Sequence, residues 1–242
     1  VDGPMELADV VLTRASGEII DGGDYPPYFG ANNQGQFLLP TEAASPGDRL
    51  ISEGGFDSIS LNELERLVLV SEAPDSYNST ELHITPITTV LSSTENSNQT
   101  MLLERLGINS TPDDIFGQDI WELATIDGDD DAINTQRIST MLGHNSLVFD
   151  AAAGAETDAA LDNAEAFARA VNSTALASDE PLDFSSAPTL KNILDTAFDE
   201  ADLSAGMDEA SKVALAGQLA SLNQVLVDDN IPLKGDLTRS LL

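Results

Sequence analysis

The spacing of apolar residues over the C-terminal two thirds of the chain is the feature that most limits its fold. Between about residue 80 and residue 227, apolar side chains recur at intervals of three and four. The clearest case, the stretch 187–203, has this register at Leu190, Ile193, Leu194, Ala197, Phe198 and Ala201. Such spacing places the apolar side chains on one face of an α-helix. The pattern therefore predicts a bundle of amphipathic helices.

Proline, glycine and capping residues indicate where these helices begin and end. Pro86 fits the first turn of a helix that begins after Thr85. Ser97 or Asn98 is the expected N-cap of the next helix, which should end at Gly107. Further helices are predicted at 132–153, 157–171, 187–203 and 207–227.

The first 72 residues lack the helical spacing and contain short apolar runs separated by residues that favour turns. Strands are predicted from these runs at 7–13, 19–20, 36–40, 49–52, 58–61 and 66–70. Short strands with frequent turns are typical of a small β-sandwich. We therefore expect an α+β fold, with a β-sandwich at residues 1–78 followed by an α-helical bundle at residues 79–242.

The charge balance limits the partners that such a protein can have. The sequence contains 42 acidic and 10 basic residues, a formal net charge of −32. Because like charges repel, we expect no binding to nucleic acid or to anionic membranes. No run approaches the roughly 20 apolar residues that a membrane helix needs, so membrane insertion is not expected. High acidity suits a salty extracellular setting, where ions screen the repulsion; acidity that serves solubility alone is the alternative.

The residues that usually carry catalysis are scarce in this sequence. There is no cysteine, and the two histidines, His83 and His144, are about 60 positions apart, outside any HExxH or GxSxG pattern. Neither a GxxxxGK[ST] loop nor a strand-borne GxGxxG is present. Carboxylates are so abundant that the proximity of any two carries almost no information. We therefore expect no catalytic residues, no cofactor site and no enzymatic activity.

Calcium is the one cofactor that the sequence leaves open. Asp127, Asp129 and Asp131 alternate as do the first ligands of a calcium-binding loop, whose oxygens must converge on one ion. The rest of that motif is missing, since Ala132 stands where glycine is needed and Ile138 where glutamate would close the site. The favoured interpretation is an acidic loop that caps the following helix, where Asp131 would gain from the helix dipole.

A second candidate site is a small group of aromatic residues. Tyr25, Tyr28 and Phe29 flank two prolines and could bind a glycan or a peptide. The alternative is that these rings pack against their own loop and fix its conformation.

The order of the segments resembles that of a known bacterial architecture. The stretches 1–12, VDGPMELADVVL, and 33–40, NQGQFLLP, resemble strands of the carboxypeptidase-regulatory-like or Cna-B-like β-sandwich. The stretches 84–91, ITPITTVL, and 103–108, LERLGI, resemble the helical region that follows such sandwiches in large bacterial surface proteins. The resemblance implies adhesion, scaffolding or extracellular ligand display, and it carries no catalytic residues.

From these features we expect a non-catalytic module of an exported bacterial surface protein, located at the cell surface, in the extracellular space or in the periplasm. We expect the chain to be part of a longer polypeptide, with any export signal outside it. An extracellular protein or glycan is the expected partner, and the oligomeric state is left open. The alternatives are a carbohydrate- or peptide-binding module and a carboxylate-dependent hydrolase.

Overall fold

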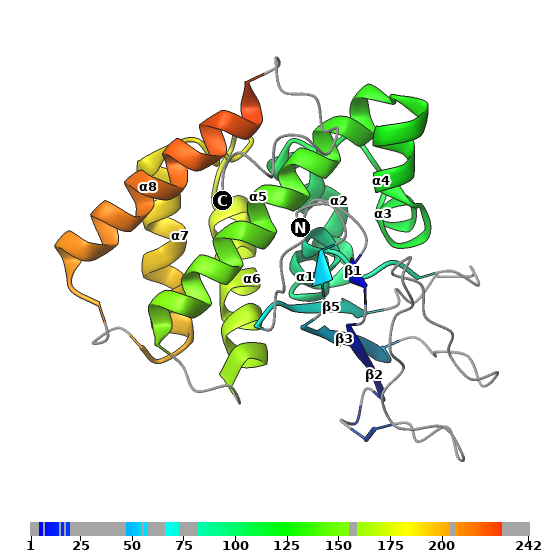
Figure 1. Cartoon of the computed structure of the whole chain (residues 1–242), viewed down its shortest axis with the longest axis horizontal. Helices are drawn as coiled ribbons and strands as arrows, with labels where there is room; N and C mark the ends of the chain where they lie inside the picture. The colour runs from blue at the N-terminus through cyan, green and yellow to red at the C-terminus, as the bar shows by residue number, and fades with distance from the viewer. Residues whose placement is uncertain are drawn as a thin grey trace.

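The fold combines a small antiparallel sheet with eight α-helices among the residues that the structure describes. The computed structural model describes residues 5–6, 8–14, 16, 18–19, 47–54, 56–57, 66–72, 82–154, 159–203 and 207–228. A long central helix, α5 (Asp130–Ala153), crosses the molecule, with α7 (Ala187–Glu200) and α8 (Glu209–Val227) on one side and the sheet on the other (Figure 1). In the described part of the chain, no helix is long and apolar enough to cross a lipid bilayer.

The sheet contains three strands in the order β2 (Asp9–Thr13), β3 (Arg49–Glu53) and β5 (Val68–Glu72). All neighbouring strands are antiparallel. A separate pair joins β1 (Met5–Glu6) to β4 (Phe56–Asp57). Val10, Leu12 and Leu50 are buried on one face of the sheet together with the half-buried Leu82 and Ile84. The strand side chains alternate between the two faces, as the period of two requires.

The predicted strands at 7–13, 49–52 and 66–70 are confirmed within two residues at each end. A bridge between Thr13 and Ile19 agrees with the predicted hairpin at 19–20. The predicted strands at 36–40 and 58–61 lie outside the described residues. Among the described elements, α1 and α6 pack against the three-stranded sheet, and these elements do not show a β-sandwich. The predicted order, β-strands in the N-terminal part followed by α-helices, is thus confirmed.

The helical part is built from helices of very different length. The remaining helices are α1 (Pro86–Ser92), α2 (Asn96–Leu106), α3 (Pro112–Gly117), α4 (Ile120–Glu122) and α6 (Ala160–Leu176). A π-helical segment, η1 (Leu123–Asp127), connects α4 to α5. The predicted helices are confirmed with shifted ends. The short elements α3, α4 and η1 were not predicted, because six or fewer residues are too few to display a helical period.

The predicted helix ends are partly right. Thr85 caps α1 and Pro86 occupies its first turn, as the sequence indicates. The predicted caps of α2 are wrong, because α2 already begins at Asn96 and Ser97 lies inside its first turn. Gly107 ends α2 in the left-handed conformation, with a φ of 77°, which glycine adopts without steric cost.

The main core lies between the long helices. Three phenylalanine rings meet there, each from a different helix: Phe149 of α5, Phe167 of α6 and Phe198 of α7. The centroid of the Phe149 ring lies 5.0 Å from that of Phe198, edge to face, and 6.0 Å from that of Phe167. Because Phe149 is fully buried and contacts both other rings, it holds the central position in this core.

Candidate functional site

The most specific polar arrangement of the structure lies where β5 meets α1. Thr89 Oγ1 accepts a hydrogen bond of 2.9 Å from the Val70 amide, and Thr88 Oγ1 donates one of 3.1 Å to the Val70 carbonyl. Ser92 Oγ accepts from the Glu72 amide at 2.9 Å. The hydroxyl groups of one helix thus occupy the hydrogen-bonding positions that a further strand would fill at the edge of the described sheet.

The local sequence of α1 explains this arrangement. Residues three and four positions apart are neighbours on a helix surface, so Ser92 lies beside both Thr89 and Thr88, and all three hydroxyls reach β5. A reciprocal cap fixes the start of the helix, since the Thr88 amide donates to Thr85 Oγ1 at 3.1 Å and the Thr85 amide donates to Thr88 Oγ1 at 2.8 Å. Pro86 follows the cap and sets its own φ for helix. The start of α1 is therefore held in one register against β5.

A buried ion pair joins the start of β5 to α5 and α6. Arg66 forms two hydrogen bonds with Asp150, from Nε at 2.5 Å and from Nη2 at 2.9 Å. Asn163 Nδ2 donates to the same carboxylate at 2.8 Å. The Asp150 side chain is 6% exposed and that of Arg66 is 32% exposed. Because a buried charge needs such partners, this group fixes the sheet relative to both helices.

The environment of Asp150 changes its acidity. Burial raises the pKa of the Asp150 carboxyl, but the hydrogen bonds from Arg66 and Asn163 and the positive charge of Arg66 outweigh burial. The net result is a pKa below the ordinary value of an aspartate. Asp150 is therefore an ionised structural partner at neutral pH, and it lacks the raised pKa typical of a general acid.

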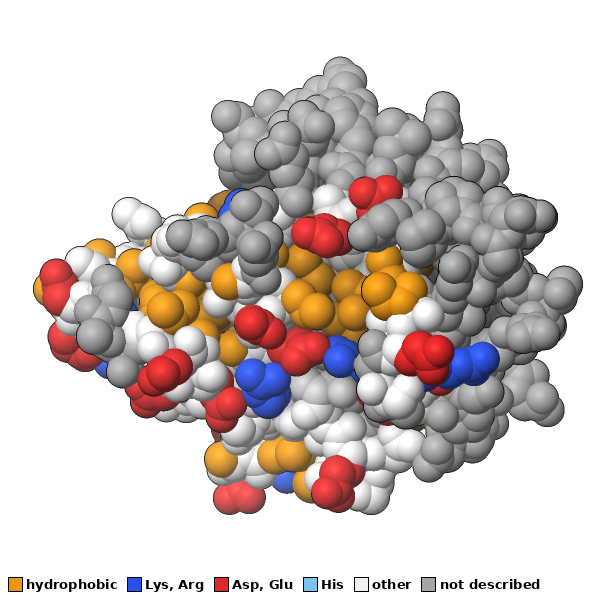
Figure 2. Space-filling model, turned by 90° about the horizontal axis from the view of Figure 1, so that it is seen from below, with side chains coloured by type: hydrophobic (Ala, Val, Ile, Leu, Met, Phe, Trp, Pro, Cys, Tyr) orange, Lys and Arg blue, Asp and Glu red, His pale blue; other side chains and the backbone are white. Residues whose placement is uncertain are grey.

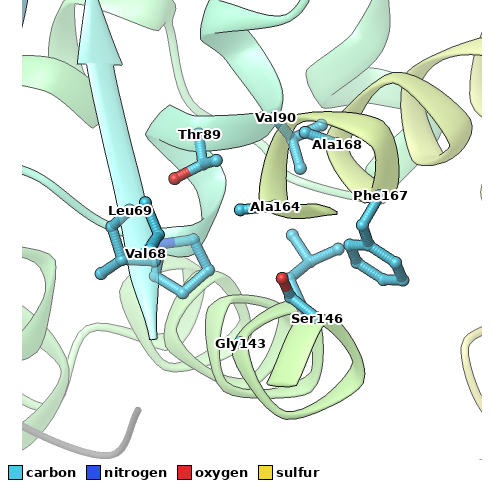
Figure 3. Close-up of a pocket in the computed structure, with 11 residues that line it drawn as sticks. Val68, Leu69, Thr89, Val90, Gly143, Ser146, Ala164, Phe167 and Ala168 are labelled. Carbon is cyan, nitrogen blue, oxygen red and sulfur yellow. The ribbon is translucent and has the colours of Figure 1, made fainter. Parts of the chain in front are cut away.

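A small cavity lies in the joint between the sheet and the helices, by which we mean the contacts of β5 with α1, α5 and α6. Figure 3 shows Val68 of β5, Thr89 of α1, Gly143 and Ser146 of α5 and Ala164 of α6 around it. Its volume is about 10 Å³. That is about the smallest space that can hold one water molecule, whereas sites for small-molecule ligands measure about 300 to 1,000 Å³. The cavity is thus a packing defect between the sheet and the helices.

Seven of the described basic side chains lie at contacts between segments. Arg49 of β3 pairs with Glu165 of α6, and Arg169 of α6 pairs with Glu200 of α7 at 3.1 Å. The same holds for the pairs Arg14–Asp48, Arg66–Asp150, Lys191–Glu209 and Lys212–Asp195, and for Arg105, which donates to the Asp179 carbonyl. Figure 2 shows one face on which central blue side chains lie beside red ones. The positive charge of these seven residues therefore serves tertiary contacts, and carboxylates dominate the remaining charged surface of the described part of the chain.

The three aspartates of the calcium hypothesis are all exposed. Asp127 ends η1, while the Asp129 carboxylate accepts from the Ala132 amide at 2.8 Å and caps α5. Asp131 lies in the first turn of α5 and accepts from Asn109 Nδ2 at 3.2 Å. Asp129 is thus the N-cap of α5, and Asp131 lies in the first turn, where the helix dipole favours a negative charge. Across the described ranges, no group of three or more His, Asp or Glu side chains is placed to hold a metal ion.

The aromatic candidates Tyr25, Tyr28 and Phe29 lie outside the described residues, so the ligand platform stays a prediction. The residues that build the joint were not among the predicted site residues. One signal for them was present, because Thr88, Thr89 and Ser92 place three hydroxyls on one side of a helix whose other side chains are apolar. The partners Arg66 and Asp150 are 84 positions apart, and no local pattern connects them.

The chain matches no known family model, no curated protein and no solved structure.

Proposed function

We propose that the chain is a non-catalytic module of an exported bacterial surface protein, which acts in adhesion or scaffolding by holding neighbouring domains in a fixed arrangement. The observation that carries the proposal is the bonding of β5 on every side. Its start is tied to α5 through Arg66 and Asp150, one edge pairs with β3, and the other edge bonds to α1.

The geometry of β5 suits a part that transmits force. Its bonds to β3 and to α1 lie side by side along the strand, so a pull along β5 loads them together and they must break together. The Arg49–Glu165 pair adds a second connection between the sheet and α6. A module that keeps its sheet and helices in one arrangement can present what is attached to its ends at a constant distance.

The charge distribution supports a location outside the cell. Since seven of the described basic residues are engaged in tertiary contacts, carboxylates are left to repel one another across the surface. This repulsion weakens as the Debye length falls from about 8 Å at physiological ionic strength to about 3 Å at 1 M salt. The β-sandwich form of the N-terminal part belongs to the same proposal and is supported by the resemblance of the stretches 1–12 and 33–40.

Pulling the chain by its two ends in an optical trap tests the proposal. We expect β2, β3, β5, α1, α5 and α6 to unfold in a single event, because the bonds along β5 are loaded together. The unfolding force in 1 M NaCl should equal or exceed that in 0.15 M NaCl, because screening reduces the repulsion. A Thr89→Val variant, which removes the acceptor for the Val70 amide, should unfold at lower force.

Two results would overturn the proposal. One is the release of the sheet in a separate event at low force, with α5 and α6 still folded. The other is turnover in a screen of esters, glycosides and peptides that a single Asp or Glu substitution abolishes, which would favour the hydrolase alternative. Glycan or peptide binding that is lost in Tyr25→Ala and Tyr28→Ala variants would instead assign the function to the aromatic loop.

A further inference from the structure

Helix α8 is held on the bundle by a small apolar contact. Its buried apolar side chains are Ala216, Leu219 and Ala220, and Leu215 and Leu226 pack half-buried against the same core. The neighbouring α7 buries a larger set, Leu190, Ile193, Leu194, Ala197 and Phe198. Because apolar stabilisation grows with the area removed from water, α8 gains less from docking than α7 does.

The contact of α8 with α5 also contains polar atoms that lack partners. Asn223 of α8 and Asn145 of α5 are both fully buried. Asn223 Nδ2 donates to the Phe184 carbonyl at 2.8 Å and to Asn145 Oδ1 at 3.4 Å. Within the described part of the chain, Asn145 Nδ2 and Asn223 Oδ1 have no hydrogen-bond partner. Since water would satisfy both atoms, their burial opposes the docking of α8.

Ion pairs between α7 and α8 counteract this unfavourable burial and hold α8 in place. Lys191 Nζ of α7 lies 2.6 Å from Asp195 on its own helix and 2.7 Å from Glu209 at the start of α8. Lys212 Nζ of α8 lies 3.3 Å from Asp195 and 5.1 Å from the centroid of the Phe198 ring. We name Lys191, Asp195, Glu209 and Lys212 the α7–α8 clasp. Two of the three lysines of the chain belong to it.

We propose that α8 is a detachable helix: the whole helix separates from α5 and α7, while the sheet and the other long helices stay folded. Lys191 of the clasp controls how often α8 separates. Detachment removes the buried asparagine pair from its unfavourable position and uncovers the side of Phe198 that Lys212 covers. The proposal goes beyond the proposed function and does not depend on it.

The absence of cysteine from the chain allows a direct test by thiol labelling. Ala216→Cys places a thiol on α8, where the alanine is 1% exposed, and Ala166→Cys places one on α6, where it is 0% exposed. A buried thiol reacts with a disulfide reagent such as DTNB only when its surroundings open. We expect the thiol at position 216 to react at least about tenfold faster than that at 166, a factor that corresponds to about 1.4 kcal/mol. Equal rates would overturn the proposal.

Removing one charge of the clasp tests its role. Lys191→Gln should speed labelling at position 216 severalfold and leave position 166 unchanged. Arg169→Gln is the matched control, because Arg169 also pairs with one carboxylate on its own helix, Glu165, and one on the next, Glu200, and neither of these partners belongs to α8. If Lys191→Gln has no effect at 216, or if both substitutions act equally there, the clasp does not control detachment.

A measurement on the unaltered chain tests detachment even if a cysteine variant fails to fold. Hydrogen exchange should show the amides of α8 exchanging at least about tenfold faster than those of α6, under conditions where the exchange rate reports the open fraction. Exchange of both helices at one common rate would contradict detachment, whatever the labelling variants show.

Discussion

A Phe149→Ala variant is expected to lose about 3 to 5 kcal/mol of its free energy of unfolding, the range typical of a fully buried phenylalanine. Phe149 is 0% exposed, and its ring contacts those of Phe167 and Phe198. Truncation removes the contacts of α5 with α6 and α7 at one point and leaves a cavity between three helices. Urea unfolding followed by circular dichroism measures the loss.

Met101→Ala is the control for this prediction. Met101 of α2 is 39% exposed, so its truncation should change the free energy of unfolding by much less, about 0.5 kcal/mol. A loss below about 1 kcal/mol for Phe149→Ala would contradict the placement of the three rings at the centre of the core.

An Asp150→Asn variant is expected to lose about 3 kcal/mol at pH 7, the lower end of the range for breaking a buried ion pair, because Arg66 is partly exposed. The substitution keeps the size of the side chain but removes the negative charge and one acceptor that Arg66 uses. Chemical denaturation at pH 7 measures the change. Glu104→Gln on α2, an exposed carboxylate, should be nearly neutral.

The same carboxylate gives the unaltered chain a specific pH dependence. The folded pKa of Asp150 lies below its unfolded value of about 3.9, so its contribution is fully present above that pH. The contribution is lost as the pH falls from about 3.9 through the folded pKa. The stability difference between the unaltered chain and Asp150→Asn should therefore be constant from pH 5 to pH 7 and shrink below pH 4. A difference that stays constant down to pH 2 would contradict the Arg66–Asp150 interaction.

The helices could be predicted from the sequence because their signals are local. Apolar spacing of three and four residues gave α5 to α8, and the Thr85–Pro86 pair gave the start of α1. The cap of α2 was missed because several polar residues in succession, 95–98, can all serve as caps. The early start of α2 goes with a tertiary contact, in which the buried Gln99 donates from Nε2 to the Leu91 carbonyl of α1 at 3.3 Å. Tertiary packing decided between locally equivalent options.

The joint between the sheet and the helices could not be predicted, because its partners are distant in the sequence. The three hydroxyls on one side of α1 are visible in the local sequence, but that pattern does not indicate that they bond to the backbone of β5. The Arg66–Asp150 contact spans 84 residues, and 42 acidic residues offer Arg66 many other partners. The packing of Ala160 and Ala164 of α6 against Val68 likewise joins segments that are distant in the sequence.

Native-state hydrogen exchange in low concentrations of urea tests the central claim that the sheet, α1, α5 and α6 form one cooperative unit. If the hydroxyls of α1 and the Arg66–Asp150 pair join these elements, the amides of β3 and β5 exchange with the same opening free energy as those of α5 and α6. Thr89→Val should lower that common value for all four elements. Exchange of the β3 and β5 amides through a smaller opening, with α5 and α6 still protected, would contradict the account.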